Sequence, residues 1–230
     1  MHALHDPGLR AAAAPPGMSA GAEEAFRAAL AGASGLVLIA GPAGSGRSTT
    51  LRTAIELAPG AATAGEIRDG ETAQSIVQAA LGGRLVVAAI EAESAVSAIT
   101  RLMLFGVERF LIAAALRIVI AQRLAPRLCP ACRRPVQAAP SPCARLGFDP
   151  GAIVYAPEGC PQCGGTGFHG RIGLFEAIPV DTGLGRLIDG RGDEAVIASH
   201  AFRGRPDLGG AARAMVREGL IRAEEALVRG

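Results

Sequence analysis

The sequence contains no lysine and no tryptophan, and it has a single tyrosine among 230 residues. Aromatic side chains make up only 3% of the chain, so the stacking platforms that bind single-stranded nucleic acid are not expected. The formal net charge of +2 is also too small to favour nucleic acid as a partner. Because all 23 basic residues are arginines, an arginine at a position usually held by lysine can reflect composition alone.

Long apolar segments are lacking as well. Residues 1–21 have no basic segment leading into an apolar core, so we expect a flexible leader and not a signal peptide. Glycines and Pro42 interrupt the uncharged stretch 28–46, and Arg117 interrupts the apolar run 110–121. We therefore expect a cytoplasmic protein, in which five cysteines indicate a metal site more often than disulfides.

A glycine-rich segment, GPAGSGRSTT, follows the apolar run LVLIA and precedes a helical pattern. A loop of this kind between a buried strand and a helix is typical of phosphate binding, because backbone N–H groups and the helix N-terminus hold an anion. It matches G-x-x-x-x-G-K-[ST] except for arginine at the lysine position. A chance glycine turn is the alternative. The predicted nucleotide-binding residues are Gly41, Pro42, Ala43, Gly44, Ser45, Gly46, Arg47, Ser48 and Thr49.

Strand and helix patterns alternate after this loop. We expect a strand at 61–64, a helix at 71–81, the strand LVVAAI and a helix at 94–104. This alternation predicts an α/β fold with a parallel sheet covered on both faces. Residues 108–128 have the pattern of one long helix ended by Pro126, and helical patterning returns after residue 172.

Four of the cysteines form two pairs with the spacing of a structural four-cysteine zinc site, Cys129-x-x-Cys132 and Cys160-x-x-Cys163. Zinc held by four thiolates stabilises a region that has no core of its own. Four unrelated reduced cysteines are one alternative. A redox pair is another, disfavoured because neither pair is expected to open a helix. Cys143 is left over and is expected to be free.

Four segments in series resemble the ATPases of type II secretion and type IV pilus assembly, in the GspE/PulE/PilB branch: GPAGSGRSTTLRTAI, GEIRDGETAQSIVQAAL, AQRLAPRLCPAC and GCPQCGGTGFHGRIGLFE. The likeness runs from about residue 22 to the end. It implies a RecA-like P-loop core, ATP with Mg²⁺, and a structural Zn²⁺. It also implies a hexamer, or a hetero-oligomer with an intact homologue, located in the cytoplasm and peripheral at inner-membrane secretion or pilus platform proteins.

The resemblance also implies roles for single residues. Ser48 would ligate Mg²⁺, and Glu66 of GEIRD would be the acidic Walker B residue and the catalytic candidate. A solvated helix-start residue is the alternative for Glu66, and Asp69 is expected to cap the next helix. The predicted domains are a leader (1–21), a shortened P-loop core (22–126), a tetracysteine zinc-binding insertion (127–172) and the C-terminal helical part of the motor domain (173–230).

Three departures from the family pattern bear on catalysis. Arg47 replaces a compact ammonium by a planar guanidinium. The two positions of the family's histidine box hold Arg84 and Glu91, so the usual γ-phosphate sensor is missing. Residues 53–65 replace a long segment that carries an acidic box. Together these changes affect most of what phosphoryl transfer requires.

Three functions remain open at this point. The chain can be an ATP-binding member with weakened or lost hydrolysis, a non-catalytic regulatory or scaffolding paralogue of the hexameric motor, or a decaying gene product. Arg47→Lys distinguishes the first two, and we expect it not to restore turnover.

Overall fold

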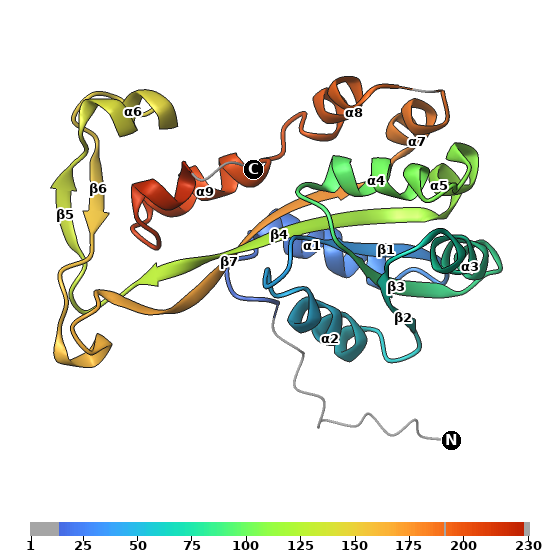
Figure 1. Ribbon diagram of the computed structural model, residues 1–230, viewed down its shortest axis with the longest axis horizontal. Helices are drawn as coiled ribbons and strands as arrows, with labels where there is room; N and C mark the ends of the chain where they lie inside the picture. Colours follow the sequence, from blue (N-terminus) through green and yellow to red (C-terminus); the bar gives the residue numbers. More distant parts are fainter. Residues whose placement is uncertain (1–13, 191, 228–230) are drawn as a thin grey trace, which may run out of the picture.

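A five-stranded sheet forms the centre of the computed structural model, which describes residues 14–190 and 192–227 (Figure 1). The strand order is β2-β3-β1-β4-β7, and only β7 runs antiparallel to its neighbour. This confirms the expected α/β class with a mostly parallel sheet. The strands are β1 (Gly35–Ala40), β2 (Ala62–Ile67), β3 (Leu85–Ile90), β4 (Leu116–Leu128) and β7 (Phe168–Pro179).

Helices cover both faces of this sheet, and alternate residues of β1 face the two layers. Val37 packs with Phe26 of the first helix layer, whereas Leu38 packs with Ile99 of the other. Burial on both sides explains why LVLIA and LVVAAI are continuously apolar. The first layer contains α1 (Ala20–Leu30) and α2 (Arg47–Leu57), and the second contains α3 (Gly70–Leu81), α4 (Ala95–Leu104), α5 (Arg109–Ala115), α7 (Thr182–Asp189) and α8 (Glu194–Ala201).

The prediction of one long helix over residues 108–128 is wrong. Helix α5 ends at Ala115, and residues 116–128 form β4, which pairs with β1 and β7. The run from Ile118 to Ile120 is β-branched and fully buried, so it suits a central strand better than a helix face. Pro126 lies past Ala121, the last residue paired with β1, where β4 has only β7 beside it and a proline is tolerated.

Other boundaries agree with the sequence within a few residues. Strand β2 extends to Ile67, so Glu66 lies within a strand and not at a helix start. Only residues 58–61 connect α2 to β2, so this connection is short. Asp69 accepts a hydrogen bond from the Thr72 N–H at 2.8 Å and caps α3, as predicted.

A second, smaller unit lies at the far end of β4 and β7, on the left of Figure 1. Its own apolar core includes Phe148, Val154 and Met215. Residues 173–179 are the second half of β7, so the helices of the C-terminal part begin only at Thr182. The unit contains β5 (Arg134–Gln137), α6 (Pro140–Leu146), β6 (Ile153–Ala156), the 3-10 turn η1 (Pro161–Cys163), α9 (Leu208–Arg217) and the 3-10 turn η2 (Ala223–Ala226).

Candidate functional site

The loop from the end of β1 to the start of α2 depends on two glycines. A Cβ at Gly41 would lie 2.3 Å from Ser45 Oγ and 2.6 Å from the Gln122 carbonyl oxygen, so no side chain fits there. Gly46 precedes α2 with φ +90°, a left-handed conformation that favours glycine. Because α2 begins at Arg47, the positive end of its dipole lies at the loop. The loop therefore has the local geometry of a phosphate cradle.

A buried glutamine that the sequence analysis did not single out braces this loop. Gln122 of β4 is 2% exposed, and its Nε2 donates to the Ser45 carbonyl at 2.8 Å. Ser45 Oγ, Arg47 Nη1 and Gln122 Oε1 are buried without a hydrogen-bond partner in the described part of the chain. Buried polar atoms are normally satisfied, and unpaired ones at a loop of this shape fit a site that binds a polar ligand.

Arg47, at the lysine position of the loop, contacts the predicted Walker B residue. Its Nη2 lies 2.7 Å from Glu66 Oε1, and Arg68 binds the other carboxylate oxygen through Nη2 at 2.6 Å and Nε at 2.8 Å. The hydrogen bond from Arg68, joined by the charge of Arg47, holds the pKa of Glu66 below its ordinary value against the opposing effect of burial. The structure thus brings two predicted site residues, Arg47 and Glu66, into direct contact.

Two further arginines lie close to the loop. A cavity of about 180 Å³ is lined by Pro42, Ala43 and Gly44 on the loop side and by Arg123 and Arg171 from β4 and β7. Glu225 also lines this cavity, so two cationic side chains and one carboxylate surround the space beside the loop.

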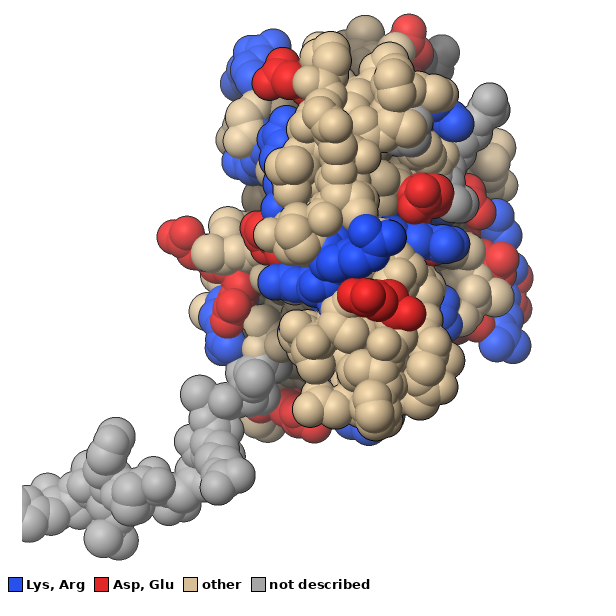
Figure 2. Space-filling model, turned by 90° about the vertical axis from the view of Figure 1, so that its left-hand side faces the viewer, with Lys and Arg blue, Asp and Glu red and all other residues tan. Residues whose placement is uncertain are grey.

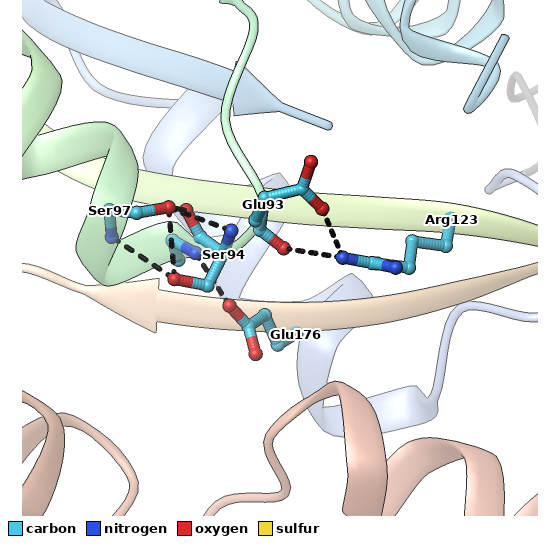
Figure 3. A network of polar contacts seen from close by, with 6 residues as sticks. Glu93, Ser94, Ser97, Arg123 and Glu176 are labelled. Carbon is cyan, nitrogen blue, oxygen red and sulfur yellow. Dashed lines mark hydrogen bonds and ion pairs between the residues drawn. The ribbon is translucent and has the colours of Figure 1, made fainter. Parts of the chain in front are cut away.

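The positions of the family's histidine box flank β3. Arg84 precedes the strand and Glu91 follows it, and both side chains are exposed. Two residues on, Glu93 forms an ion pair with Arg123 of β4 (Figure 3). Ser94 then caps α4 through a reciprocal pair of hydrogen bonds with Ser97. The segment after β3 is therefore well fixed, but it presents carboxylates and not imidazoles.

A buried carboxylate joins the two units of the chain. Glu176 of β7 is 2% exposed and accepts hydrogen bonds from the N–H groups of Ala95 at 2.6 Å and Leu208 at 2.9 Å. It therefore binds the first residues of both α4 and α9, and Figure 3 shows its bond to α4. Burial raises the pKa of Glu176 despite these two bonds, with Asp207 adding to the rise and Arg123 opposing it.

The four paired cysteines come together, as their spacing predicts. Their Sγ atoms all lie within 4.8 Å of one another, with contacts of 3.9 Å (Cys129 to Cys160), 3.8 Å (Cys132 to Cys163) and 3.8 Å (Cys160 to Cys163). A tetrahedral ion with bonds of about 2.3 Å places sulfurs about 3.8 Å apart, so the cluster has the right size for a metal ion.

Cys163 has the surroundings of a thiolate. Loss of solvent raises its pKa, but N–H groups of Cys160 and Gly167 donate to its Sγ at 3.2 Å each, and the pKa falls to about 6. Cys160 precedes the 3-10 turn η1, so the expectation that neither pair opens a helix is wrong for this pair, although the turn has only three residues. Cys143 is buried in the apolar core of the same unit, outside the cluster.

Several arginines lie on the surface of the smaller unit. Figure 2 views the molecule from this side and shows a band of basic side chains, all of them arginine in this chain, between two broad uncharged areas. Several arginines of the unit rest on aromatic rings, which keeps them in place. The pairs are Arg133 over Tyr155 at 4.9 Å, Arg217 over Phe148 at 4.8 Å and Arg222 over Phe168 at 5.7 Å.

A parallel sheet whose central strand leads through a glycine loop into a helix places the chain among α/β proteins of the P-loop class. Within that class it belongs to the Type II/IV secretion system protein family, whose model matches residues 58–228. The matched region contains Glu66 and the four paired cysteines, and it begins after the glycine loop.

The relatives agree with this assignment. The chain is 39% identical over 179 residues to type II secretion system protein E of Pseudomonas aeruginosa, covering 77% of this chain and 36% of the relative. It is 32% identical to type II secretion system ATPase E of Vibrio cholerae, covering 92% and 51%, and 31% identical to the type IV pilus assembly ATPase PilB of Myxococcus xanthus, covering 77% and 40%. The chain thus spans about a third to a half of the length of these relatives.

Solved structures show the same fold. The pilus retraction motor PilT, solved with bound ADP, superposes with a TM-score of 0.60 at 18% identity, covering 87% of this chain and 62% of the motor. The ATPase DotB of Legionella pneumophila also gives 0.60, at 16% identity, covering 94% and 65%. In the residues described here, no helix combines the length and apolar character that crossing a bilayer requires.

Proposed function

We propose that this chain binds ATP with Mg²⁺ through its phosphate loop, that its hydrolysis is weakened or lost, and that it serves type II secretion or type IV pilus assembly. The observation that carries the proposal is the geometry of the loop. Gly41 leaves no room for a side chain, and α2 starts at Arg47. Buried polar atoms of Ser45 and Arg47 have no hydrogen-bond partner in the described part of the chain. The proposed nucleotide-binding residues are those of the loop and the first turn of α2, 41–49.

The residues present fit magnesium and nucleotide in part. Ser48, exposed at the start of α2, would supply a hydroxyl ligand to Mg²⁺, which would neutralise negative charge on the phosphates. Glu66 stays the catalytic candidate, but both of its oxygens are engaged by arginines. A carboxylate held in this way does not readily orient a water molecule. Weak turnover follows from this contact together with Arg84, Glu91 and the short 58–61 connection.

Equilibrium binding of a fluorescent ATP analogue tests the first half of the proposal. We expect saturable binding to the wild type and loss of binding in Gly41→Ala, because the added Cβ collides with Ser45 and the Gln122 carbonyl. Gly60→Ala is the matched control, since a Cβ there meets nothing within 4 Å. Lack of saturable binding at millimolar nucleotide would sink the proposal. A phosphate-release assay tests the second half.

We propose further that Cys129, Cys132, Cys160 and Cys163 hold a structural Zn²⁺. The supporting observation is the size of the sulfur cluster together with the N–H donors that favour a thiolate at Cys163. Bound zinc would cross-link the ends of β4 and β7, because the cysteine pairs follow the first strand and precede the second. The domain limits given above, with residues 127–172 as the zinc-binding insertion, remain part of this proposal.

For assembly and location, we propose a hexamer, or a hetero-oligomer with an intact homologue, in the cytoplasm at inner-membrane platform proteins. The family assignment supports this. A non-catalytic regulatory or scaffolding role is the second candidate, and the ion pair between Arg47 and Glu66 favours it. It predicts co-purification with a full-length homologue from the same cell, and isolation in every pull-down would contradict it.

A further inference from the structure

The two oxygens of the Glu66 carboxylate contact two different arginines. Arg47 holds Oε1 through one nitrogen, and Arg68 holds Oε2 through two. The two cations differ in surroundings, since the Arg47 side chain is 13% exposed and that of Arg68 is 78% exposed. The buried partner is the residue that occupies the lysine position of the phosphate loop.

Arg47 therefore has two potential anionic partners that exclude each other in part. Its Nη2 is bound to Glu66, while its Nη1 is buried with no hydrogen-bond partner in the part of the chain described. A guanidinium binds phosphate best as a fork, through two nitrogens. A fork through Nη1 and Nη2 shares the nitrogen that binds Glu66, so it brings phosphate next to that carboxylate, and the two negative charges repel each other.

Arg68 lowers the cost of this exchange. When Arg47 leaves, Glu66 keeps two hydrogen bonds from Arg68 at 2.6 and 2.8 Å, so it is not left as an unpaired charge. Without Arg68, Glu66 would have Arg47 as its only arginine contact among those the structure records, and it would hold Arg47 more tightly.

We infer that Glu66 regulates this site as an internal anion that competes with phosphate for Arg47, and that Arg68 takes over Glu66 when a phosphate binds. The inference rests on the proposed nucleotide binding and deepens it. It gives Glu66 a role opposite to that of a residue that holds the metal or its water, because the carboxylate here opposes the ligand.

The test measures the dissociation constant of a fluorescent ADP analogue with magnesium left out, so that neither hydrolysis nor metal ligation contributes. We expect Glu66→Gln to bind about three- to tenfold more tightly than the wild type, the range between an exposed and a part-buried ion pair. We expect Arg68→Gln to bind about two- to fivefold more weakly. Glu66→Gln keeps the length of the side chain, Arg68→Gln shortens an exposed one, and thermal melting checks the folding of both variants.

Two controls separate the ion pair from a general charge effect. Glu71→Gln removes a negative charge, as Glu66→Gln does, at an exposed position in the first turn of α3. Arg52→Gln removes a positive charge, as Arg68→Gln does, on the exposed side of α2. Both should bind like the wild type. If they shift the constant as much as the Glu66 and Arg68 variants do, a general field explains the result and the inference fails.

The remaining outcomes are distinct. Equal constants for the wild type and Glu66→Gln, or weaker binding by Glu66→Gln, overturn the inference and leave nucleotide binding standing. Lack of saturable binding by both proteins in this assay overturns the inference, and it overturns the proposed function as well if binding of the ATP analogue with Mg²⁺ is also absent. Tighter binding by Glu66→Gln that disappears in the double variant with Arg47→Ala supports the competition directly.

Discussion

Arg47 shows how much one residue can change the proposed nucleotide site. A lysine ends in a single compact charge, whereas the guanidinium of Arg47 offers several donors in a plane. In this chain one donor reaches Glu66 at 2.7 Å and another is buried without a partner. The same residue therefore carries the positive charge of the loop and binds Glu66, the proposed catalytic carboxylate.

Arg47→Lys is expected not to restore ATP turnover. The ammonium repairs the charge geometry of the loop, but Arg84 and Glu91 still occupy the histidine positions and the 58–61 connection is still short. A phosphate-release assay on the purified variant checks this. Turnover restored by this single change would show that the histidine positions and the missing segment matter little.

Glu176 is expected to contribute to stability through its hydrogen bonds to the first residues of α4 and α9. Glu176→Ala leaves the buried N–H groups of Ala95 and Leu208 unpaired, and we expect a loss of about 1–3 kcal/mol in the free energy of unfolding. Urea denaturation measures it. Glu194→Gln, an exposed change in the first turn of α8, is the control and should have little effect.

The pH dependence of this residue has a defined sign. The pKa of Glu176 is raised in the folded chain, so its contribution to stability is complete below the unfolded pKa of about 4.3 and is lost as the pH rises through the folded pKa. The stability of the wild type relative to Glu176→Gln should therefore fall as the pH rises above about 4.3. Urea titrations at several pH values test this, and a constant difference would contradict it.

At the scale of elements, β4 explains both a wrong prediction and a missed residue. Helical and strand patterns cannot be separated in a short run that is apolar throughout, and only pairing with β1 and β7 settles residues 116–128. Once they form a strand, Gln122 lies beside the phosphate loop. Its polarity within the apolar run VIAQRL was the one available signal. By contrast, local patterns determine the strand and helix around the phosphate loop, and also the Asp69 cap. The sequence therefore predicted these features.

Gln122→Leu is expected to weaken nucleotide binding. Leucine has a similar volume but leaves the Ser45 carbonyl without its donor at 2.8 Å, so the loop loses its brace. We expect about a three- to tenfold rise in the dissociation constant of ADP, as for one lost hydrogen bond of about 0.5–1.5 kcal/mol. Gln137→Leu, at an exposed position of β5, serves as the control.

At the scale of the whole molecule, sequence spacing predicts the cysteine cluster but not the contact between Glu66 and Arg47. The pairs have the standard separation for a metal site, and the structure brings all four sulfurs within 4.8 Å. The contact of Glu66 with Arg47 depends on β2 lying two strands away from β1, with β3 between them. No local pattern encodes that arrangement, so the sequence could propose both residues without predicting their ion pair.

Cys132→Ser is expected to abolish stoichiometric zinc. Loss of the ion should increase amide hydrogen exchange in residues 129–167, while β1 and β3 in the main sheet stay protected, because they have a separate core. Elemental analysis and hydrogen exchange measure the two effects. Cys143→Ala should keep the zinc, since Cys143 lies outside the cluster. Equal metal content in all three proteins would exclude the four-thiolate site.

The β4–β7 ribbon connects the two ends of the molecule (Figure 1). Gln122 and Cys129 belong to one continuous run of chain, and at about 3.3 Å per residue roughly 23 Å of it separates them. Over most of this run β4 pairs with β7, with one shift of register between Pro126 and Leu128. The loop and the sulfur cluster are therefore joined through paired strands and not through an unpaired linker.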